Sequence, residues 1–582
     1  MFFSSRHSAI AGLIFLLAAA GCSRNSEREA AGRIAVLPFE NLSGDAAFDW
    51  AGSAIQEIVV SDLTGAAKLD PVATGTAREA AGVKRILSGY YAQEGGALRF
   101  HGVLRDAASG KTISSYLHDA PVLEAGNRMA RSVTAEARPY GTTSEVALRA
   151  YLEGTQTGAL EPFEKALSAD AGYGEAWVAL VRRQAQSAGR DKALEVVERA
   201  RQHNGKFHKI ERARIELLAA TLRNDTAAQV RLLEELTRLT PADGSLPGTV
   251  AQAYYATRDF AKAAEWYRKA AVAGEGDAQG WNLAIYAHAF AGDYARAKDA
   301  FESYRKAAPE NPNPFDSMGE VDYYFGRFDA AEKSFLEANR LAPSFLGGWT
   351  LRKAAQARLM LGGDPAQAGE SFKLFLEARK QANDPLIEYY GARWDYLTGK
   401  HAEATKRLEA WLKGEARGDM AALANAQLAA WKLAEGDRVS ALALSAAALK
   451  VAQSPPARFQ AFVVQFSAQP KATVAEWQVR AARALPEPAA AGLRNQMVCY
   501  ALLLDKDFVG AVEGLQALHA QTQPPNAGEA AVLLAWAYVE SGQSARAKPL
   551  VERSPIPNLL APDVFEFLQF PRALALRKAL GL

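Results

Sequence analysis

The sequence predicts a small α/β domain followed by an all-α superhelix of repeated helix pairs, so the chain should be mostly helical. Two observations carry this prediction. Segments of strand and helix character alternate between residues 33 and 140. Beyond residue 141, alanine is abundant, and large and small residues recur at a constant spacing. A chain of 582 residues is too long for one hydrophobic core, which agrees with two unlike parts.

Charge and cysteine content exclude several classes of protein. The 67 Lys and Arg residues nearly balance the 65 Asp and Glu residues, which leaves a formal net charge of +2. Such a balance creates no long-range field to gather nucleic acid, so we expect no nucleic-acid partner. Two cysteines, Cys22 and Cys499, are too few for a disulfide framework or a cysteine-rich metal site. Cys499 stands in an apolar segment, where we expect it to be a small buried hydrophobic residue.

The N-terminal segment has the features of an export signal. A short head with Arg6 precedes an uncharged, mostly apolar run from Ala9 to Ala20. At about 1.5 Å per residue this run is too short to span a bilayer as a helix, but it suits a signal peptide. We therefore expect residues 1–21 to be a signal peptide and residues 22–32 to be a tether.

The end of this signal resembles the lipobox of bacterial lipoprotein precursors, because small residues in Leu17-Ala18-Ala19-Ala20-Gly21 precede Cys22. The resemblance implies cleavage after Gly21, lipidation of Cys22 and attachment to a membrane by acyl chains. Ala19 departs from the pattern, which commonly has leucine there. Ser23 in place of an aspartate implies the outer membrane, facing the periplasm. The alternative is an ordinary secretory signal that leaves a soluble periplasmic protein.

Residues 33–140 are predicted to form an α/β domain. Apolar residues at helical spacing indicate a helix over 50–63, and Glu94-Gly95-Gly96 indicates a hairpin between two strands. A weak helix over 76–81 and a closing helix over 122–137 complete the pattern. The expected strands cover residues 34–39, 70–73, 85–93, 98–104 and 111–117.

The opening string of this domain, from Ile34 to Asp45 (IAVLPFENLSGD), resembles that of the TolB amino-terminal-like domain. Residues 83–89 and 99–110 resemble further parts of it, and the second helical region is shorter than in the family. The resemblance implies a domain for protein contact or assembly. The Ser43-Gly44-Asp45 turn lacks the lysine and the spacing of a phosphate-binding loop, so we expect it to be an ordinary turn.

Four columns of residues in the second part share one period. They are Phe260, Tyr294 and Phe328; Ala263, Ala297 and Ala331; Trp281, Phe315 and Trp349; and Pro309 and Pro343. The small residues allow two helices to approach closely, and proline ends a helix because it cannot continue one. Gly292 and Gly326 are expected in the turns between the paired helices. The columns predict consecutive antiparallel helix hairpins across residues 241–349.

The shared period of about 34 residues is that of the tetratricopeptide repeat, and this part of the sequence resembles that family. The period extends less regularly outward, with Phe163 and Ala166 marking an early repeat and more widely spaced glycine turns, such as those at Gly399 and Gly436, marking later ones. We expect about ten to twelve repeats over residues 141–582. Stacked hairpins of this kind leave a concave surface that binds a protein partner.

Positions on the first helix of each repeat line that surface in the family. When the 34-residue period is used to find these positions, they are occupied by tyrosines beside carboxylates, which suit an extended or helical peptide of some basic character. The competing interpretation is that these tyrosines merely cover the surface of a helix. An acidic C-terminal tail is an unsuitable ligand here, because carboxylates replace the required lysine and asparagine. The candidate partner-binding residues are Tyr255, Asn282, Tyr286, Asp316, Glu320, Tyr323 and Tyr324.

The sequence contains no motif of a known catalytic or metal site. None of its eight histidines stands in an H-E-x-x-H pattern, and no nucleophile elbow or dinucleotide-binding glycine motif occurs. We therefore expect no catalytic residue, no metal and no cofactor. The sequence favours an exported, non-enzymatic lipoprotein scaffold. The alternatives are an envelope protein that senses a ligand or signals through its TolB-like domain, and a hydrolase hidden among degenerate repeats.

Overall fold

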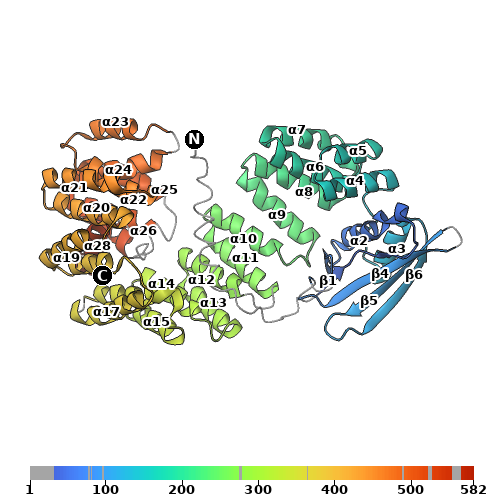
Figure 1. Cartoon of the computed structure of the whole chain (residues 1–582), viewed down its shortest axis with the longest axis horizontal. Coiled ribbons are helices and arrows are strands. Elements are labelled where there is room, and N and C mark those ends of the chain that lie inside the picture. Colours follow the sequence, from blue (N-terminus) through green and yellow to red (C-terminus); the bar gives the residue numbers. More distant parts are fainter. Residues whose placement is uncertain are drawn as a thin grey trace. The chain divides into compact units, whose positions relative to one another are not determined.

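A computed structural model describes residues 32–582, except 77–78, 80–81, 95–96, 274–277, 363–364, 488–489, 522–526 and 553–564. Its elements fall into two compact units, residues 1–291 and 292–582. A mixed sheet near the N-terminus is followed by stacked helices, as the sequence predicts (Figure 1). The signal peptide, Cys22 and most of the tether lie outside the described residues.

The sheet has the order β3-β1-β4-β5-β6, with β2 also paired to β4. Strand β1 is parallel to β3 and β4, whereas β5 is antiparallel to both β4 and β6. The strands are β1 (Arg33–Val36), β2 (Glu40–Asn41), β3 (Asp70–Ala73), β4 (Arg85–Glu94), β5 (Ala97–Asp106) and β6 (Thr112–Asp119). A parallel pair next to an antiparallel meander requires a crossover helix, and α2 (Trp50–Leu63) supplies it between β1 and β3.

Several expected boundaries in this domain differ from the structure, those of the strands over 85–93, 98–104 and 111–117 by one or two residues. Two larger differences have a local cause. The first strand ends at Val36 rather than residue 39, next to Pro38, which has no N–H to donate to a sheet. The closing helix α3 (Val122–Val133) ends before residue 137, since Thr134 is extended at φ −153°. The helix over 50–63 and the strand over 70–73 are confirmed to the residue. Most of the weak helix over 76–81 and the Gly95-Gly96 turn lie outside the described residues.

The helices after residue 144 form consecutive hairpins. In the first unit these are α4 (Glu145–Thr157) with α5 (Glu161–Ala169), α6 (Gly174–Ser187) with α7 (Arg190–Arg201), α8 (Lys209–Leu222) with α9 (Thr226–Leu239), and α10 (Leu246–Ala256) with α11 (Phe260–Ala273), followed by α12 (Ala278–Phe290). The short 3₁₀ turns η1 (Ala46–Phe48) and η2 (Asn204–Lys206) also belong to this unit.

The second unit continues the pattern from α13 (Tyr294–Ala307). Its hairpins are α14 (Asn313–Tyr324) with α15 (Phe328–Leu341), α16 (Trp349–Met360) with α17 (Pro365–Gln381), α18 (Ile387–Leu397) with α19 (His401–Gly414), α20 (Gly418–Ala434) with α21 (Arg438–Val451), α24 (Ala491–Leu504) with α25 (Phe508–Gln521) and α26 (Ala527–Glu540) with α27 (Ser544–Val551). Helices α22 (Pro455–Ser467) and α23 (Val474–Ala484) lie between α21 and α24 in the chain, and both pack on α24. The turn η3 (Phe345–Gly348) precedes α16, and α28 (Glu566–Ala579) follows α27.

The alanine and proline columns have the structural roles that the sequence predicts. Ala263, Ala297 and Ala331 are fully buried. The aromatic column Phe260, Tyr294 and Phe328 begins the second helix of each pair. Helices α13 and α15 end just before Pro309 and Pro343.

One type of turn joins the two helices of many hairpins. A residue with positive φ comes first, and it is Gly292 at φ 84° in one turn and Asn224 at φ 55° in another. The residue after it caps the second helix, because the carboxylates of Asp293 and Asp225 accept backbone N–H bonds of 3.0 Å from the first turn. The chain thus keeps the left-handed turn even where glycine is absent.

The α/β domain and the first hairpins share one hydrophobic core. This core runs without interruption from Ile34 and Phe100 of the sheet, through Ile58 of α2, to Trp177 of α6 and Val197 of α7. The region around residue 140 is therefore packed, and Tyr140 itself is buried.

Candidate functional site

Three of the predicted partner-binding residues belong to the first unit. Tyr255 of α10 is half-buried, with its ring 5.2 Å from that of Phe260 and 6.3 Å from that of Phe290. Tyr286 of α12 packs 6.1 Å from the same Phe290, and Asn282 lies one turn earlier on that helix. Burial raises the pKa of Tyr255 to about 12. Tyr255 and Tyr286 therefore belong to an aromatic cluster around Phe290, and Asn282 lies one helical turn from Tyr286.

The other four residues belong to the second unit, where two of them share Lys353 as an ion-pair partner. Asp316 of α14 accepts two hydrogen bonds of 2.9 Å from Nζ of Lys353 on α16, and Glu320 accepts one of 2.5 Å from the same atom. Asp316 is only 4% exposed, and burial raises its pKa to about 6 despite the pull of Lys353. The basic group that we expected from a partner is thus supplied by Lys353 itself.

Tyr323 and Tyr324 differ in exposure although they are adjacent. Tyr323 is 2% exposed and its ring lies 5.0 Å from that of Phe328, so it belongs to the core. Tyr324 is half-buried and packs against Phe325. Tyr324 therefore has more surface to offer a partner than Tyr323 or Asp316, and the binding role of all seven residues stays a prediction.

A second site, which the sequence did not predict, lies where the α/β domain meets the first three hairpins. Helix α2 packs on α4, and residues of α2 line a common cavity with residues of α6 and α8. Helices α4, α6 and α8 are the first helices of their hairpins. The face that first helices form in this part of the array is thus covered by a helix of the same chain.

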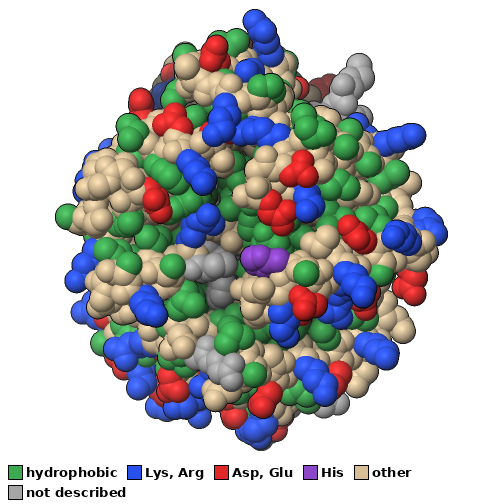
Figure 2. Space-filling model, turned by 90° about the vertical axis from the view of Figure 1, so that its left-hand side faces the viewer, with side chains coloured by type: hydrophobic (Ala, Val, Ile, Leu, Met, Phe, Trp, Pro, Cys, Tyr) green, Lys and Arg blue, Asp and Glu red, His purple; other side chains and the backbone are tan. Residues whose placement is uncertain are grey.

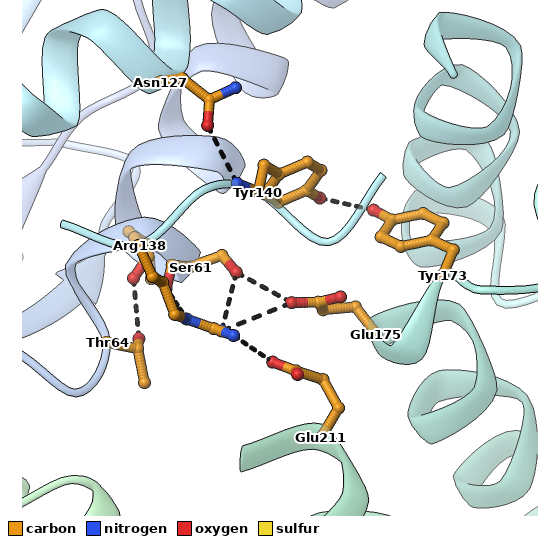
Figure 3. A network of polar contacts seen from close by, with 9 residues as sticks. Ser61, Thr64, Asn127, Arg138, Tyr140, Tyr173, Glu175 and Glu211 are labelled. Carbon is orange, nitrogen blue, oxygen red and sulfur yellow. Dashed lines mark hydrogen bonds and ion pairs between the residues drawn. The ribbon is translucent and has the colours of Figure 1, made fainter. Parts of the chain in front are cut away.

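Arg138 connects the α/β domain to the helix hairpins at this junction (Figure 3). Its guanidinium lies 2.6 Å from Oε1 of Glu211 on α8 and 3.5 Å from Oε1 of Glu175 on α6. Its Nε donates to the backbone oxygen of Ser61 on α2, and the Ser61 hydroxyl donates to Glu175 across 2.9 Å. One arginine therefore holds the end of α2 against carboxylates of two successive repeats.

The carboxyl groups here outnumber the cation that pairs with them. Burial raises the pKa of Asp62 to about 8, with Arg138 opposing and the Glu175 charge adding to the rise. Burial and the neighbouring Glu211 raise the pKa of Glu175 to about 7, which Arg138 opposes. Glu175 and Glu211 are 8% and 1% exposed. Because their pKa values are raised, the carboxyl groups of Asp62 and Glu175 retain protons that water would remove.

Tyrosines complete the polar network. The hydroxyls of Tyr140 and Tyr173 are hydrogen-bonded to each other, and the backbone N–H of Tyr140 donates to Oδ1 of Asn127 across 2.9 Å (Figure 3). Burial raises the pKa of Glu57 on α2, while hydrogen bonds from Tyr151 and Tyr140 and the charge of Arg214 oppose the rise. The network thus joins α2 and α3 to the first two hairpins.

Beside this network is a cavity of about 270 Å³. Charged side chains from three helices line it: Glu57 of α2, Glu175 and Arg182 of α6, and Glu211 and Arg214 of α8. Its wall also includes Ser61, Thr64, Asp70, Tyr151, Thr240 and Asp243. A cavity with charges of both signs in its wall can hold a small polar molecule.

Other classes of site are not found in the described part of the chain. Among those residues, no group of three or more His, Cys, Asp and Glu side chains could hold a metal ion. No helix within the same ranges is long and apolar enough to span a bilayer. Figure 2 shows acidic and basic side chains interspersed on the face that it presents, in agreement with the net charge of +2.

No family model matches the chain, and no curated protein matches it. Solved structures with similar helical stacks include the MamA protein, 16% identical over 30% of this chain and 92% of its own, with a TM-score of 0.25. The C-terminal part of a TPR repeat-containing protein from Cytophaga hutchinsonii is 12% identical over 40% and 93%, with a TM-score of 0.33. A tetratricopeptide repeat protein from Parabacteroides merdae is 13% identical over 44% and 98%, with a TM-score of 0.29.

Helix hairpins with left-handed turns, buried alanines and one repeating period occur together in this chain. The helical part is an array of tetratricopeptide-like helix hairpins. Within it, Glu175 and Glu211 stand near the start of successive first helices, at a spacing close to the period of the repeat. That spacing was the one signal for the junction, and it is too weak alone to reveal a site that also needs Ser61 and Arg138.

Proposed function

We propose that this chain is an exported, non-enzymatic lipoprotein whose tetratricopeptide-type array holds a protein partner. The observation behind the proposal is that α2 packs on the first helix α4 and lines a common cavity with the first helices α6 and α8. A face built by first helices accepts a helix here, so the same face in later repeats suits an amphipathic helix of another protein. Helices α20, α22 and α24 contact one another in sequence and continue such a face.

Residues on or beside the cluster around Phe290 are the first choice for this contact in the first unit. The test is chemical crosslinking followed by affinity purification of the full chain from membranes. We expect one stoichiometric partner, and we expect the double variant Asn282→Ala and Tyr286→Ala to lose it. Arg268→Ala, an exposed change on the second helix α11, is the matched control. The absence of any stoichiometric partner, or equal recovery with both variants, would contradict the proposal.

The anchor is a separate part of the proposal, because Cys22 lies outside the described residues. Two or more acyl chains give stable attachment, since each buried CH₂ contributes about 0.8 kcal/mol. The lipobox-like string before Cys22 supports lipidation, and Ser23 supports the outer membrane facing the periplasm. We expect Cys22→Ser to move the chain from the membrane to the soluble fraction, with Cys499→Ser as the control. Unchanged membrane fractionation of Cys22→Ser would rule out the lipid anchor.

In this proposal the α/β domain is a TolB-like domain, and its function is contact with proteins rather than catalysis. A second candidate function is the sensing of a small ligand by this domain. The observation that favours it is the charged cavity between α2 and the first hairpins. The two functions are separable, because one concerns a protein on later repeats and the other a small molecule at the junction.

A further inference from the structure

We infer that the cavity between α2 and the helices α4, α6 and α8 binds a small zwitterion of the size of an α-amino acid. This inference deepens the ligand-sensing function and does not depend on the scaffold function. The inference is based on the size of the cavity and on two groups of charged side chains that line the cavity.

The first group is a pair of arginines. Arg182 of α6 and Arg214 of α8 both line the cavity, and neither forms an ion pair with another residue in the part of the chain that is described. Burial lowers the pKa of Arg182, and the positive charge of Arg214 lowers it further. Two neighbouring guanidinium groups that lack a direct ion pair suit a carboxylate, which can accept hydrogen bonds from both.

The second group is a pair of buried carboxylates. Glu175 and Glu211 line the same cavity, and Oε2 of each is buried without a hydrogen bond to any described residue. Arg138 forms an ion pair with each of them through Oε1, which leaves Oε2 unpaired. A buried carboxyl oxygen that lacks a hydrogen bond is costly, and an ammonium group placed here would donate the missing hydrogen bonds.

The size of the cavity restricts the ligand to a small molecule. Its volume of about 270 Å³ lies just below the range for ligand pockets, which begins at roughly 300 Å³. A zwitterion with its carboxylate at Arg182 and Arg214 and its ammonium at Glu175 and Glu211 satisfies both groups at once. Because α2 and the repeats both contribute to the wall, a bound ligand would also stabilise the junction between them.

The test is calorimetric titration of the purified full chain with each of the common α-amino acids. Propionate and propylamine serve as probes that carry only one of the two charges. We expect at least one amino acid to bind with a dissociation constant between about 1 µM and 1 mM, and both single-charge probes to bind at least about tenfold more weakly.

Arg214→Gln should weaken that binding by about tenfold or more, since it removes half of the carboxylate site. Arg231→Gln, an exposed change on α9, is the matched control and should leave binding unchanged. Circular dichroism and the urea midpoint of each variant confirm that it is folded. The inference is overturned if no amino acid binds, if propionate alone binds as tightly, or if Arg214→Gln binds like the control.

Discussion

Nζ of Lys353 lies 2.9 Å from each carboxylate oxygen of Asp316, so the two side chains form a bidentate ion pair within the array. Both residues are less than a tenth exposed. The pair joins the successive first helices α14 and α16, and Glu320 adds a second carboxylate to the same ammonium group. It is therefore a structural contact between neighbouring repeats.

Removing the cation from this pair should destabilise the second unit strongly. We expect Lys353→Met to lower the free energy of unfolding by about 3–5 kcal/mol, because Asp316 remains buried without a partner. Lys333→Met is the control, since its pair with Asp329 is exposed and contributes roughly 0–1 kcal/mol. Urea denaturation followed by circular dichroism measures both changes. Equal effects in the two variants would show that Asp316 and Lys353 do not depend on each other.

Two glycines within helices of the second unit should respond oppositely to alanine. A Cβ atom at Gly319 of α14 would lie 2.6 Å from Cε1 of Phe335, a fully buried ring, so Gly319→Ala should destabilise by about 1–3 kcal/mol. A Cβ atom at Gly369 of α17 would meet no atom within 4 Å. Gly369→Ala should therefore stabilise by about 0.5–1 kcal/mol through helix propensity. Urea denaturation measures the free energy of unfolding of both variants. If both changes have the same sign, the described packing of Gly319 against Phe335 is wrong.

The junction in the first unit should lose stability as the pH rises. Burial raises the pKa of Asp62 from 3.8 to about 8, so between these values the folded state holds a proton that the unfolded state releases. The unfolded state then binds fewer protons, and the free energy of unfolding falls with increasing pH. Glu175, with a pKa of about 7, acts in the same direction.

Asp62→Asn should remove a large part of this dependence, because the amide does not titrate. The measurement is the urea midpoint of the wild-type chain and the variant at about pH 5 and about pH 8. Asp191→Asn, an exposed change on α7, should retain the wild-type slope. A wild-type midpoint that rises between these two pH values would contradict the buried, protonated state of Asp62.

Cys499 should be chemically inert in the folded protein. It is 1% exposed on α24, and burial raises the pKa of its thiol to about 12, so little of the reactive thiolate forms near neutral pH. In a chain carrying Cys22→Ser, we expect no reaction with an aromatic disulfide reagent at about pH 8 until denaturant is added. One equivalent released within seconds from the folded chain would show that α24 is not packed as described.

The sequence was sufficient for features that depend on neighbours along the chain. Helix α2 and strand β3 follow from local periodicity and have the predicted bounds. The buried alanines of the array follow from a spacing that repeats because each hairpin packs only on the next. The expected strand over 34–39 was too long because an apolar run gives no sign of where its hydrogen bonds end.

Partner-binding positions were harder to predict than the fold. The phase of the repeat placed Asp316 and Tyr323 on first helices, as observed, but it gave no information about what faces them. Lys353 forms an ion pair with the carboxylate of Asp316, and the ring of Phe328 packs against that of Tyr323. The position of a residue within the repeat does not tell whether a side chain of the next repeat covers it.

By itself, the amino-acid sequence determined the order of elements, the hairpin period and the residues that form the helix contacts. Only the tertiary structure decided that α2 lies on α4, α6 and α8, and that Arg138 joins Ser61, Glu175 and Glu211 beside a charged cavity. The physical reason is the range of the interactions. Helix periods and turns act over a few neighbouring positions, whereas this site depends on polar contacts between residues as distant along the chain as Ser61 and Glu175.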